Sequence, residues 1–168
     1  GLWNSVRLEL VPSMHISRPY LYTESIGDDV ANLCFEVEIA DGRVDELMPN
    51  FDKNAEKSVY CRAYDTGLTG DVLESKVQIG VVISDGEKAV YNETEEVPLS
   101  DFENLGMSRD FYELQFYRRK IEIKNPVLWY PNGLGEQHLY DVSVTLSYDG
   151  TVCDEHSFKF GIRTFTSD

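Results

Sequence analysis

The sequence predicts an all-β protein folded as an antiparallel sandwich. Short runs of alternating apolar and polar residues recur along the chain, turn residues separate these runs, and no stretch has the periodicity of an amphipathic helix. The chain has 168 residues, of which 42% are hydrophobic and 27% charged, which is the size and composition of one globular domain. We therefore expect a single domain over residues 1–168, with two sheets around one core.

The first strands are expected in the N-terminal quarter of the chain. Residues 6–10 alternate apolar with polar side chains until Pro12, and residues 20–23 have the character of a short extended segment. The clearest strand covers residues 33–39, in which every odd residue is apolar. The turn residues Asp41-Gly42 predict its end.

Two stretches interrupt the strand pattern. Residues 43–57 and residues 93–110 are rich in polar side chains and lack any periodicity, and both are too long for ordinary sandwich turns. We expect them to be two inserted loops. Strand character resumes between them, first over residues 59–64.

Two hairpins are predicted in the rest of the chain. The first spans residues 77–91 around Asp85-Gly86, and the second spans residues 140–162 around Asp149-Gly150. The apolar phases of the predicted strands should share one core between the sheets. The expected core residues are Leu33, Phe35, Val37, Ile39, Val142, Val144, Leu146, Phe158 and Phe160.

One strand has a pattern that changes phase. Its apolar residues have even numbers over residues 112–116 and odd numbers over residues 121–123. A side chain period of two allows only one inward phase in a regular strand. We therefore expect a β-bulge or a bend within residues 117–120.

The charge of the chain excludes several classes of partner. Fifteen basic and thirty acidic residues give a formal net charge of -15, which repels nucleic acid and anionic membrane surfaces. No run of about 18 apolar residues predicts a membrane span. Because Gly1 opens the sequence within an apparent strand lead-in, we expect a longer parent chain in which any export signal lies upstream.

No residue pattern predicts a metal site or a disulfide framework. Cys34, Cys61 and Cys153 are widely spaced and form no Cys-x-x-Cys pair, so three free thiols are favoured over a single bridge. His15 and His138, like the third histidine of the chain, have no metal-ligand spacing. We expect no metal ion and no cofactor.

Catalytic residues are not predicted either. Glu36, Glu38 and Glu122 are on outward strand phases. A general acid needs a partly apolar pocket that raises the pKa of its carboxyl group, and an open strand face does not supply one. The glycines within residues 132–135 are followed by no helix pattern that could complete a phosphate site, so a turn is the better interpretation.

Two aromatic residues in a loop leave two interpretations open. Trp129 and Tyr130 lie between predicted strands, where they could be platforms for stacking sugars or anchors for packing and domain contact. We favour the second interpretation, with Trp129 as an anchor at the end of the sandwich and residues 130–135 as an exposed turn.

Three segments carry a resemblance to a known family. Residues 127–140, with Trp129 to Gly133 at their centre, and residues 160–165 are similar in order and spacing to the second half of the immunoglobulin-like domain of glycoside hydrolase family 2. Residues 1–8 resemble the stretch in which that family's chain leaves a preceding jelly-roll domain, although Asn4 replaces the common arginine. The form of the central motif is most similar to the β-mannosidase and exo-β-glucosaminidase branch.

This resemblance implies an immunoglobulin-like sandwich within a larger enzyme. The parent would have a jelly roll, whose exit strand is residues 1–12, then this sandwich, then a (β/α)8 barrel carrying the two catalytic glutamates of a retaining exo-glycosidase. Since neither catalytic motif lies in this chain, it is expected to be a non-catalytic module that contacts carbohydrate only through its parent.

The resemblance also implies where the module meets its neighbours. The residues expected to contact the jelly roll or the barrel are Trp3, Trp129, Tyr130 and Asn132. A periplasmic or secreted location is expected for such a parent. The alternative is a stand-alone carbohydrate-binding or adhesive sandwich, suggested by the loop aromatics and the ten tyrosines.

Overall fold

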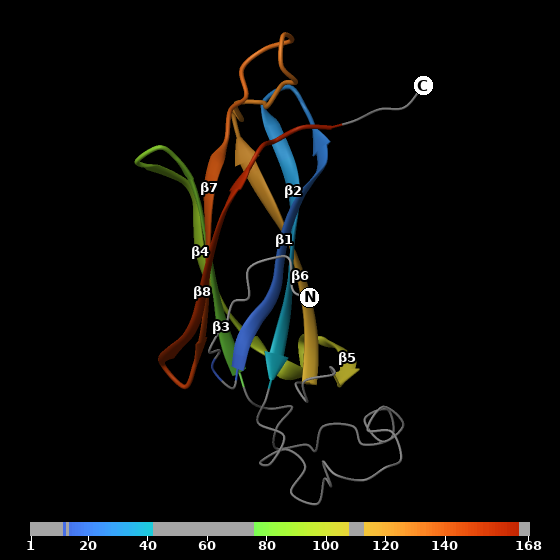
Figure 1. Ribbon diagram of the computed structural model, residues 1–168, viewed down its shortest axis with the longest axis vertical. Coiled ribbons are helices and arrows are strands. Elements are labelled where there is room, and N and C mark those ends of the chain that lie inside the picture. Colours follow the sequence, from blue (N-terminus) through green and yellow to red (C-terminus); the bar gives the residue numbers. More distant parts are fainter. Residues whose placement is uncertain (1–11, 13, 42–75, 108–112, 165–168) are drawn as a thin grey trace, which may run out of the picture.

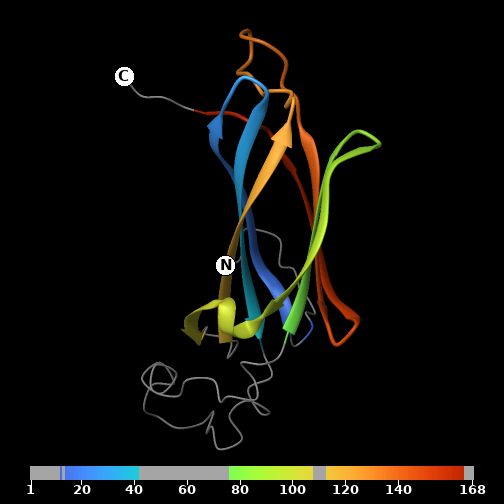
Figure 2. The ribbon, with the colours of Figure 1, turned by 180° about the vertical axis from the view of Figure 1, so that it is seen from behind.

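In its described residues, the protein is a sandwich of two four-stranded antiparallel sheets (Figures 1 and 2). The computed structural model describes residues 12, 14–41, 76–107 and 113–164. In spatial order the first sheet contains β1 (Met14–Ile26), β2 (Val30–Asp41), β6 (Glu113–Lys124) and β5 (Glu103–Met107). The second contains β4 (Lys88–Pro98), β3 (Lys76–Asp85), β7 (Tyr140–Tyr148) and β8 (Thr151–Phe160). A single 3₁₀ turn, Leu99–Asp101, joins β4 to β5.

The strand order is that of an immunoglobulin-like domain. In such domains the first, second, fifth and fourth standard strands form one sheet, and the third, sixth and seventh form the other. With β4 taken as the extra strand beside the third, the order β1-β2-β6-β5 against β4-β3-β7-β8 matches this arrangement. The predicted all-β, immunoglobulin-like sandwich is confirmed.

The predicted core is also confirmed in its main part. All the expected core residues of β2 and β7 are at most 1% exposed, whereas Phe158 and Phe160 of the edge strand β8 are half-buried against them. The hairpin of β3 and β4 turns at Gly86, whose positive φ of 57° suits glycine, and the hairpin of β7 and β8 turns at Asp149-Gly150. The strands predicted at residues 6–10 and 59–64, and the insertion at residues 43–57, lie outside the described residues.

Strand β1 is longer than the segment that the sequence predicts. Its pairing with β2 shifts register twice, and these shifts interrupt the alternation of inward and outward residues. The shifts occur between Ile16 and Arg18 and between Thr23 and Ser25. Each shift moves the inward phase from one parity to the other, so Met14 and Ile16 are buried upstream while Leu21 is buried between the shifts. An inward phase that changes parity twice gives no continuous alternation, so the sequence predicts only the short segment of residues 20–23.

The predicted loop over residues 93–110 is wrong in its described part. Residues 93–98 continue β4, and β5 follows the 3₁₀ turn; only residues 108–110 lie outside the described residues. Strand β4 is an edge strand with few buried side chains, so it has no apolar alternation to reveal it. The buried residues of the stretch, Val97, Leu99 and Phe102, lie near its middle, at and just beyond the end of β4.

The predicted bulge within residues 117–120 is wrong as well. Strand β6 pairs with β2 from end to end without a register shift, and its odd residues face inward throughout the described side chains. The inward set includes Tyr117 and Arg119, while Phe116 lies on the outer face beneath the guanidinium of Arg118, 5.5 Å from its ring centre. The polar residue Arg119 lies on the inward face and the aromatic residue Phe116 on the outward face, so the apolar pattern of the sequence suggested a change of phase that the strand does not have.

Cys34 shows that the outward phase of β2 is not fully exposed. Its thiol is buried, opposite Tyr22 of β1, and its interaction with the Tyr22 hydroxyl, together with burial, raises the pKa of Tyr22 to about 12. Cys34 and the half-buried Cys153 of the other sheet are both free thiols. Cys61 lies outside the described residues.

Arg119 closes the seam between the two sheets on the β4 side. Its side chain is only 8% exposed, and its guanidinium lies 5.8 Å from the ring centre of Phe35 and 5.7 Å from that of Tyr91. It donates to Glu95 at 3.3 Å, and Tyr117 donates to the same carboxylate at 3.0 Å. One cation thus joins β6 of the first sheet to β4 of the second.

The tyrosines of this seam predict a loss of stability in alkali. Burial and hydrogen bonds to Glu93 and Glu95 raise the pKa values of Tyr91 and Tyr117 from 10.0 to about 12. The folded state therefore holds these protons more tightly than the unfolded state, so their contribution is complete below pH 10 and is lost as the pH rises through about 12.

Denaturant unfolding at a series of alkaline pH values, with tyrosinate absorbance followed in parallel, measures this effect. The free energy of unfolding should fall between about pH 10 and 12, and it should fall less steeply in Tyr117→Phe. An equal slope in the variant would show that Tyr117 does not carry the effect.

Candidate interdomain docking surface

The loop of residues 125–139 projects from one end of the sandwich (Figure 1). It connects β6 in the first sheet to β7 in the second. The β1–β2 turn and residues 161–164, with which the described chain ends, lie at the same end of the molecule (Figures 1 and 2). Loops at the ends of a sandwich are the usual positions for recognition, because the sheets fix their roots.

The root of the loop is held by hydrogen bonds to the β1–β2 turn and to β7. The backbone N–H of Asn125, at a left-handed φ of 49°, donates to the carbonyl of Asp29 in the β1–β2 turn at 2.7 Å. The N–H of Val127 donates to the hydroxyl of Tyr140 at 2.8 Å. Tyr140 is 1% exposed, and its burial raises the pKa of that hydroxyl, which stays protonated. The loop therefore starts from a rigid base.

Trp129 anchors the middle of the loop to the C-terminal segment. Its N–H donates to the carbonyl of the buried Ile162 at 2.9 Å, and it forms an isolated antiparallel bridge with Gln137. The guanidinium of Arg163 lies 4.5 Å from the centre of the indole. On Gly161, a Cβ atom would lie 2.9 Å from the Trp129 side chain, so only glycine permits this approach.

The tip of the loop has a defined turn. The N–H of Tyr130 donates to the carbonyl of Glu136, and the N–H of Leu134 donates to that of Pro131 at 3.0 Å. Gly133 has a φ of 84°, as the third residue of a type II turn requires. A Cβ on Gly135 would lie 2.7 Å from the Tyr130 ring, so the ring is seated directly on that glycine.

Large apolar side chains are concentrated on this loop. Among the described residues, six large hydrophobic side chains are clearly exposed, and four of them belong to the loop: Leu134 at 75%, Leu139 at 45%, Tyr130 at 43% and Val127 at 40%. Grouped apolar exposure of this kind marks contact surfaces in proteins. We call these four residues, with Asn132 on the same turn, the end-loop surface.

His138 ties the loop to the second sheet. Its ring meets that of Tyr140 edge to face, with 4.8 Å between centroids, and its Nε2 atom lies 3.3 Å from an oxygen of Asp85 in the β3–β4 turn. The Nε2 atom is buried and has no well-aligned hydrogen bond. His138 therefore packs beneath the loop and links it to β3 and β7.

The structure brings three of the four predicted contact residues onto one loop. Tyr130 and Asn132 are exposed, Trp129 is half-buried, and Trp3 lies outside the described residues. Sequence reasoning placed Leu134 within the expected exposed turn but did not name it as a contact residue, although it is the most exposed of the apolar residues. It also missed Arg163, whose place beside Trp129 depends on two segments meeting in space. The available signal for Leu134 was an apolar residue within a glycine-rich turn, where no strand phase could bury it.

The remaining acidic residues form ordinary surface contacts. Glu36 makes an ion pair with Arg118 at 2.6 Å on the outer face of the first sheet, and Glu38 accepts a hydrogen bond from Ser17. No group of three metal-binding side chains occurs within the ranges that the structure describes. Across the same ranges, no helix is long and apolar enough to cross a membrane.

Fold and surface together define an immunoglobulin-like β-sandwich domain with an apolar contact loop at one end. The family model of glycosyl hydrolases family 2 matches residues 14–163. Since this match covers most of the chain, the protein belongs to glycosyl hydrolases family 2.

Individual relatives match shorter segments. Beta-mannosidase B of Aspergillus terreus is 46% identical over 44 residues, which are 26% of this chain and 5% of the relative. Exo-beta-D-glucosaminidase of Hypocrea jecorina is 47% identical over 45 residues, which are 27% of this chain and 5% of the relative.

Solved structures share the fold over nearly the whole chain. A family 2 member from Bacteroides cellulosilyticus superposes with a TM-score of 0.57 at 20% identity, over 91% of this chain and 16% of that protein. Beta-glucuronidase 2 of Bacteroides uniformis gives a TM-score of 0.57 at 15% identity, over 94% of this chain and 15% of that protein. The chain thus spans less than a fifth of the length of these proteins.

Proposed function

We propose that this chain is a non-catalytic structural module of a longer glycoside hydrolase, and that its end-loop surface docks on a neighbouring domain of the same parent. The observation that carries the proposal is a loop with a hydrogen-bonded root that exposes apolar side chains at one end of the sandwich, the end at which the described chain stops. A surface of this kind gains stability only when a partner covers it.

The parent in this proposal is a retaining exo-acting glycosidase of β-mannosidase type. The names of the partial relatives support a β-mannosidase or exo-β-glucosaminidase activity for the parent. A jelly roll would precede this module and a (β/α)8 barrel with the catalytic glutamates would follow it, and the parent would be periplasmic or secreted. The contacts to these domains would come from Trp3, Trp129, Tyr130 and Asn132.

The loop supports domain contact better than the alternative of a stand-alone sugar-binding or adhesive sandwich. The rings of both aromatic residues that suggested a sugar platform already pack against other residues of this chain. Arg163 lies over the ring of Trp129, and the ring of Tyr130 rests on Gly135. The apolar side chain with the greatest exposure is instead an aliphatic one, Leu134, which suits packing against protein.

A charge placed on the end-loop surface tests the docking role. Leu134→Asp should leave the melting temperature of this chain alone unchanged, because the side chain is 75% exposed. The same change should lower the melting temperature of the full-length parent, because docking would bury an unpaired carboxylate. The matched control is Val152→Asp on β8, which is 54% exposed and outside the loop, and should affect neither protein.

Two results would contradict the proposal. One is a Leu134→Asp parent as stable as the unchanged parent. The other is hydrolysis of chromogenic β-mannosides or β-glucosaminides by this chain alone, since a module without catalytic residues should release no chromophore.

A further inference from the structure

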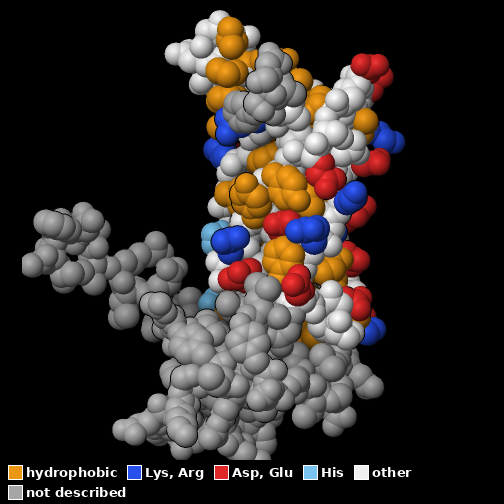
Figure 3. Space-filling view, turned by 90° about the vertical axis from the view of Figure 1, so that its right-hand side faces the viewer, with side chains coloured by type: hydrophobic (Ala, Val, Ile, Leu, Met, Phe, Trp, Pro, Cys, Tyr) orange, Lys and Arg blue, Asp and Glu red, His pale blue; other side chains and the backbone are white. Residues whose placement is uncertain are grey.

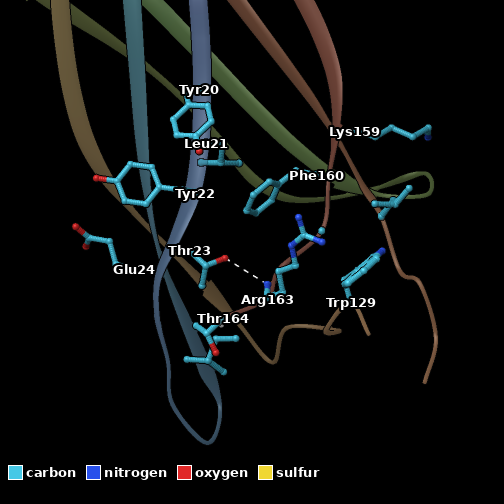
Figure 4. Close-up of a pocket in the computed structure, with 13 residues that line it drawn as sticks. Tyr20, Leu21, Tyr22, Thr23, Glu24, Trp129, Lys159, Phe160, Arg163 and Thr164 are labelled. Atoms are coloured by element: carbon cyan, nitrogen blue, oxygen red, sulfur yellow. Dashed lines mark hydrogen bonds between the residues drawn. The ribbon is translucent and has the colours of Figure 1, made fainter. Parts of the chain in front are cut away.

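The outer face of the first sheet carries aromatic side chains on strands whose other face forms the core. In Figure 4, Tyr22 lies on one side of β1, while Leu21 and Phe160 lie on the other, toward the seam between the sheets. Tyr20 shares the outward phase of Tyr22, and Phe116 projects outward from β6. Figure 3 views the side of the molecule on which this sheet lies, and hydrophobic side chains gather there among acidic and basic ones.

Contacts on the same face hold these aromatic side chains in place. The rings of Tyr20 and Tyr22 lie 5.7 Å apart, and the hydroxyl of Tyr22 donates to Glu36 at 3.3 Å. The guanidinium of Arg118 pairs with Glu36 and lies 5.5 Å from the ring centre of Phe116. We call Tyr20, Tyr22, Phe116 and Arg118 the outer aromatic patch. Because its side chains already have neighbours, covering the patch orders few additional groups.

The face around the outer aromatic patch is balanced in charge, whereas the chain as a whole has a net charge of -15. The described outward side chains of β1, β2 and β6 include four basic and four acidic ones: Arg18, Arg118, Lys120, Lys124, Glu24, Glu36, Glu38 and Glu122. Ion pairs join Arg118 to Glu36 at 2.6 Å and Lys120 to Glu24 at 3.6 Å. Another protein surface can therefore cover these four charges without leaving any of them unpaired.

We propose that this face packs against the same face of a second copy of the chain, forming a weak two-fold dimer. A two-fold interface must complement itself, since each copy presents the same surface, and a patch with equal numbers of basic and acidic groups can do so. The net charge of -15 makes two copies repel each other, so a neutral face is the place where they can approach. Tyr, Phe and Arg are the residue types enriched at the centre of protein interfaces. The inference does not depend on the docking role of the end loop.

The size of the face indicates a weak dimer. Strands lie about 4.8 Å apart and rise about 3.3 Å per residue, so about ten residues on each of the three strands cover roughly 15 Å by 30 Å. Two such faces would bury roughly 1,000 Å² in total, which is at the low end of specific interfaces. We therefore expect a Kd in the range of about 10 to 100 µM.

The geometry of β1 disfavours the other way in which two copies could associate, by pairing their edge strands. Edge pairing needs a continuous row of free backbone groups. Strand β1 has two register shifts, one on each side of Tyr20, and Pro19 between them lacks an N–H. Such interruptions protect sheet edges from pairing with another chain.

Sedimentation equilibrium of this chain between about 10 µM and 1 mM tests the proposal. A reversible dimer should form, and Tyr20→Ser should raise its Kd by about tenfold or more. The melting temperature should stay nearly unchanged in this variant, because Tyr20 is 53% exposed. Leu134→Asp is the matched control: it removes an exposed apolar side chain outside the outer aromatic patch and should leave the Kd unchanged.

Ionic strength gives a second measurement on the same samples. Raising the NaCl concentration from about 0.05 to 0.5 M screens the repulsion between two acidic copies, so the Kd should fall by about threefold or more. The ion pairs of the face lie within each copy, so salt should not weaken the dimer by breaking contacts between copies.

Three outcomes would overturn the inference. The first is a chain that stays monomeric at about 1 mM. The second is a dimer that Leu134→Asp weakens and Tyr20→Ser does not, which would assign the contact to the end-loop surface. The third is a Kd that rises with salt, which would assign the contact to ion pairs between oppositely charged surfaces.

Discussion

Replacing Arg119 with alanine is expected to lower the free energy of unfolding by about 3 kcal/mol. The Arg119 side chain is 8% exposed, its guanidinium packs against the rings of Phe35 and Tyr91, and its partner Glu95 belongs to the opposite sheet. The alanine variant loses the link between the sheets and leaves a void beside Phe35. Urea unfolding of the two proteins measures the difference.

Two further variants separate the possible causes of this loss. Arg119→Met keeps the volume and removes the buried charge, so its cost should be within about 1 kcal/mol. Arg118→Ala removes the neighbouring arginine, which is 57% exposed and paired with Glu36, and should cost less than about 1 kcal/mol. Equal effects of Arg118→Ala and Arg119→Ala would contradict the assignment of Arg119 to the seam.

Trp129→Ala is expected to cost a similar amount, about 3 kcal/mol. The indole is half-buried between Gly161 and Arg163, and its backbone holds the loop to Ile162. The expected loss of free energy is a large share of the roughly 5 to 15 kcal/mol that stabilises a domain. The melting temperature of the variant should therefore fall strongly.

Gly161→Ala tests the same contact from the other side. Its new methyl group would lie 2.9 Å from the Trp129 side chain, and such overpacking typically costs about 1 to 3 kcal/mol. Leu134→Ala, on the same loop but 75% exposed, should stay within about 0.5 kcal/mol of the unchanged protein. A Trp129→Ala protein with unchanged stability and lost saccharide binding would contradict the anchor role.

The central strands could be predicted from the sequence because each buries one regular face. In β2, β3 and β7 every second residue is apolar and buried, so the alternation specifies both the strand and its inward phase. Edge strands lack this constraint. Strand β4 is exposed along most of its length and β1 changes register twice, so neither shows a continuous alternation.

Side chains that depend on a meeting of distant segments could not be predicted. Arg119 can lie on the inward face of β6 because it donates a hydrogen bond to Glu95, which belongs to the opposite sheet and is distant in sequence. Arg163 reaches Trp129 in the same way. The end loop and its exposed turn over residues 130–135 were predicted, since the turn residues and the motif are local.

Amide hydrogen exchange of residues 127–139 in this chain alone and in its full-length parent tests the docking role most directly. The account predicts that the amides at the loop tip, around Leu134, exchange at least about tenfold more slowly in the parent, because a neighbouring domain covers them. Equal exchange rates in the two proteins, with the sandwich folded in both, would contradict it.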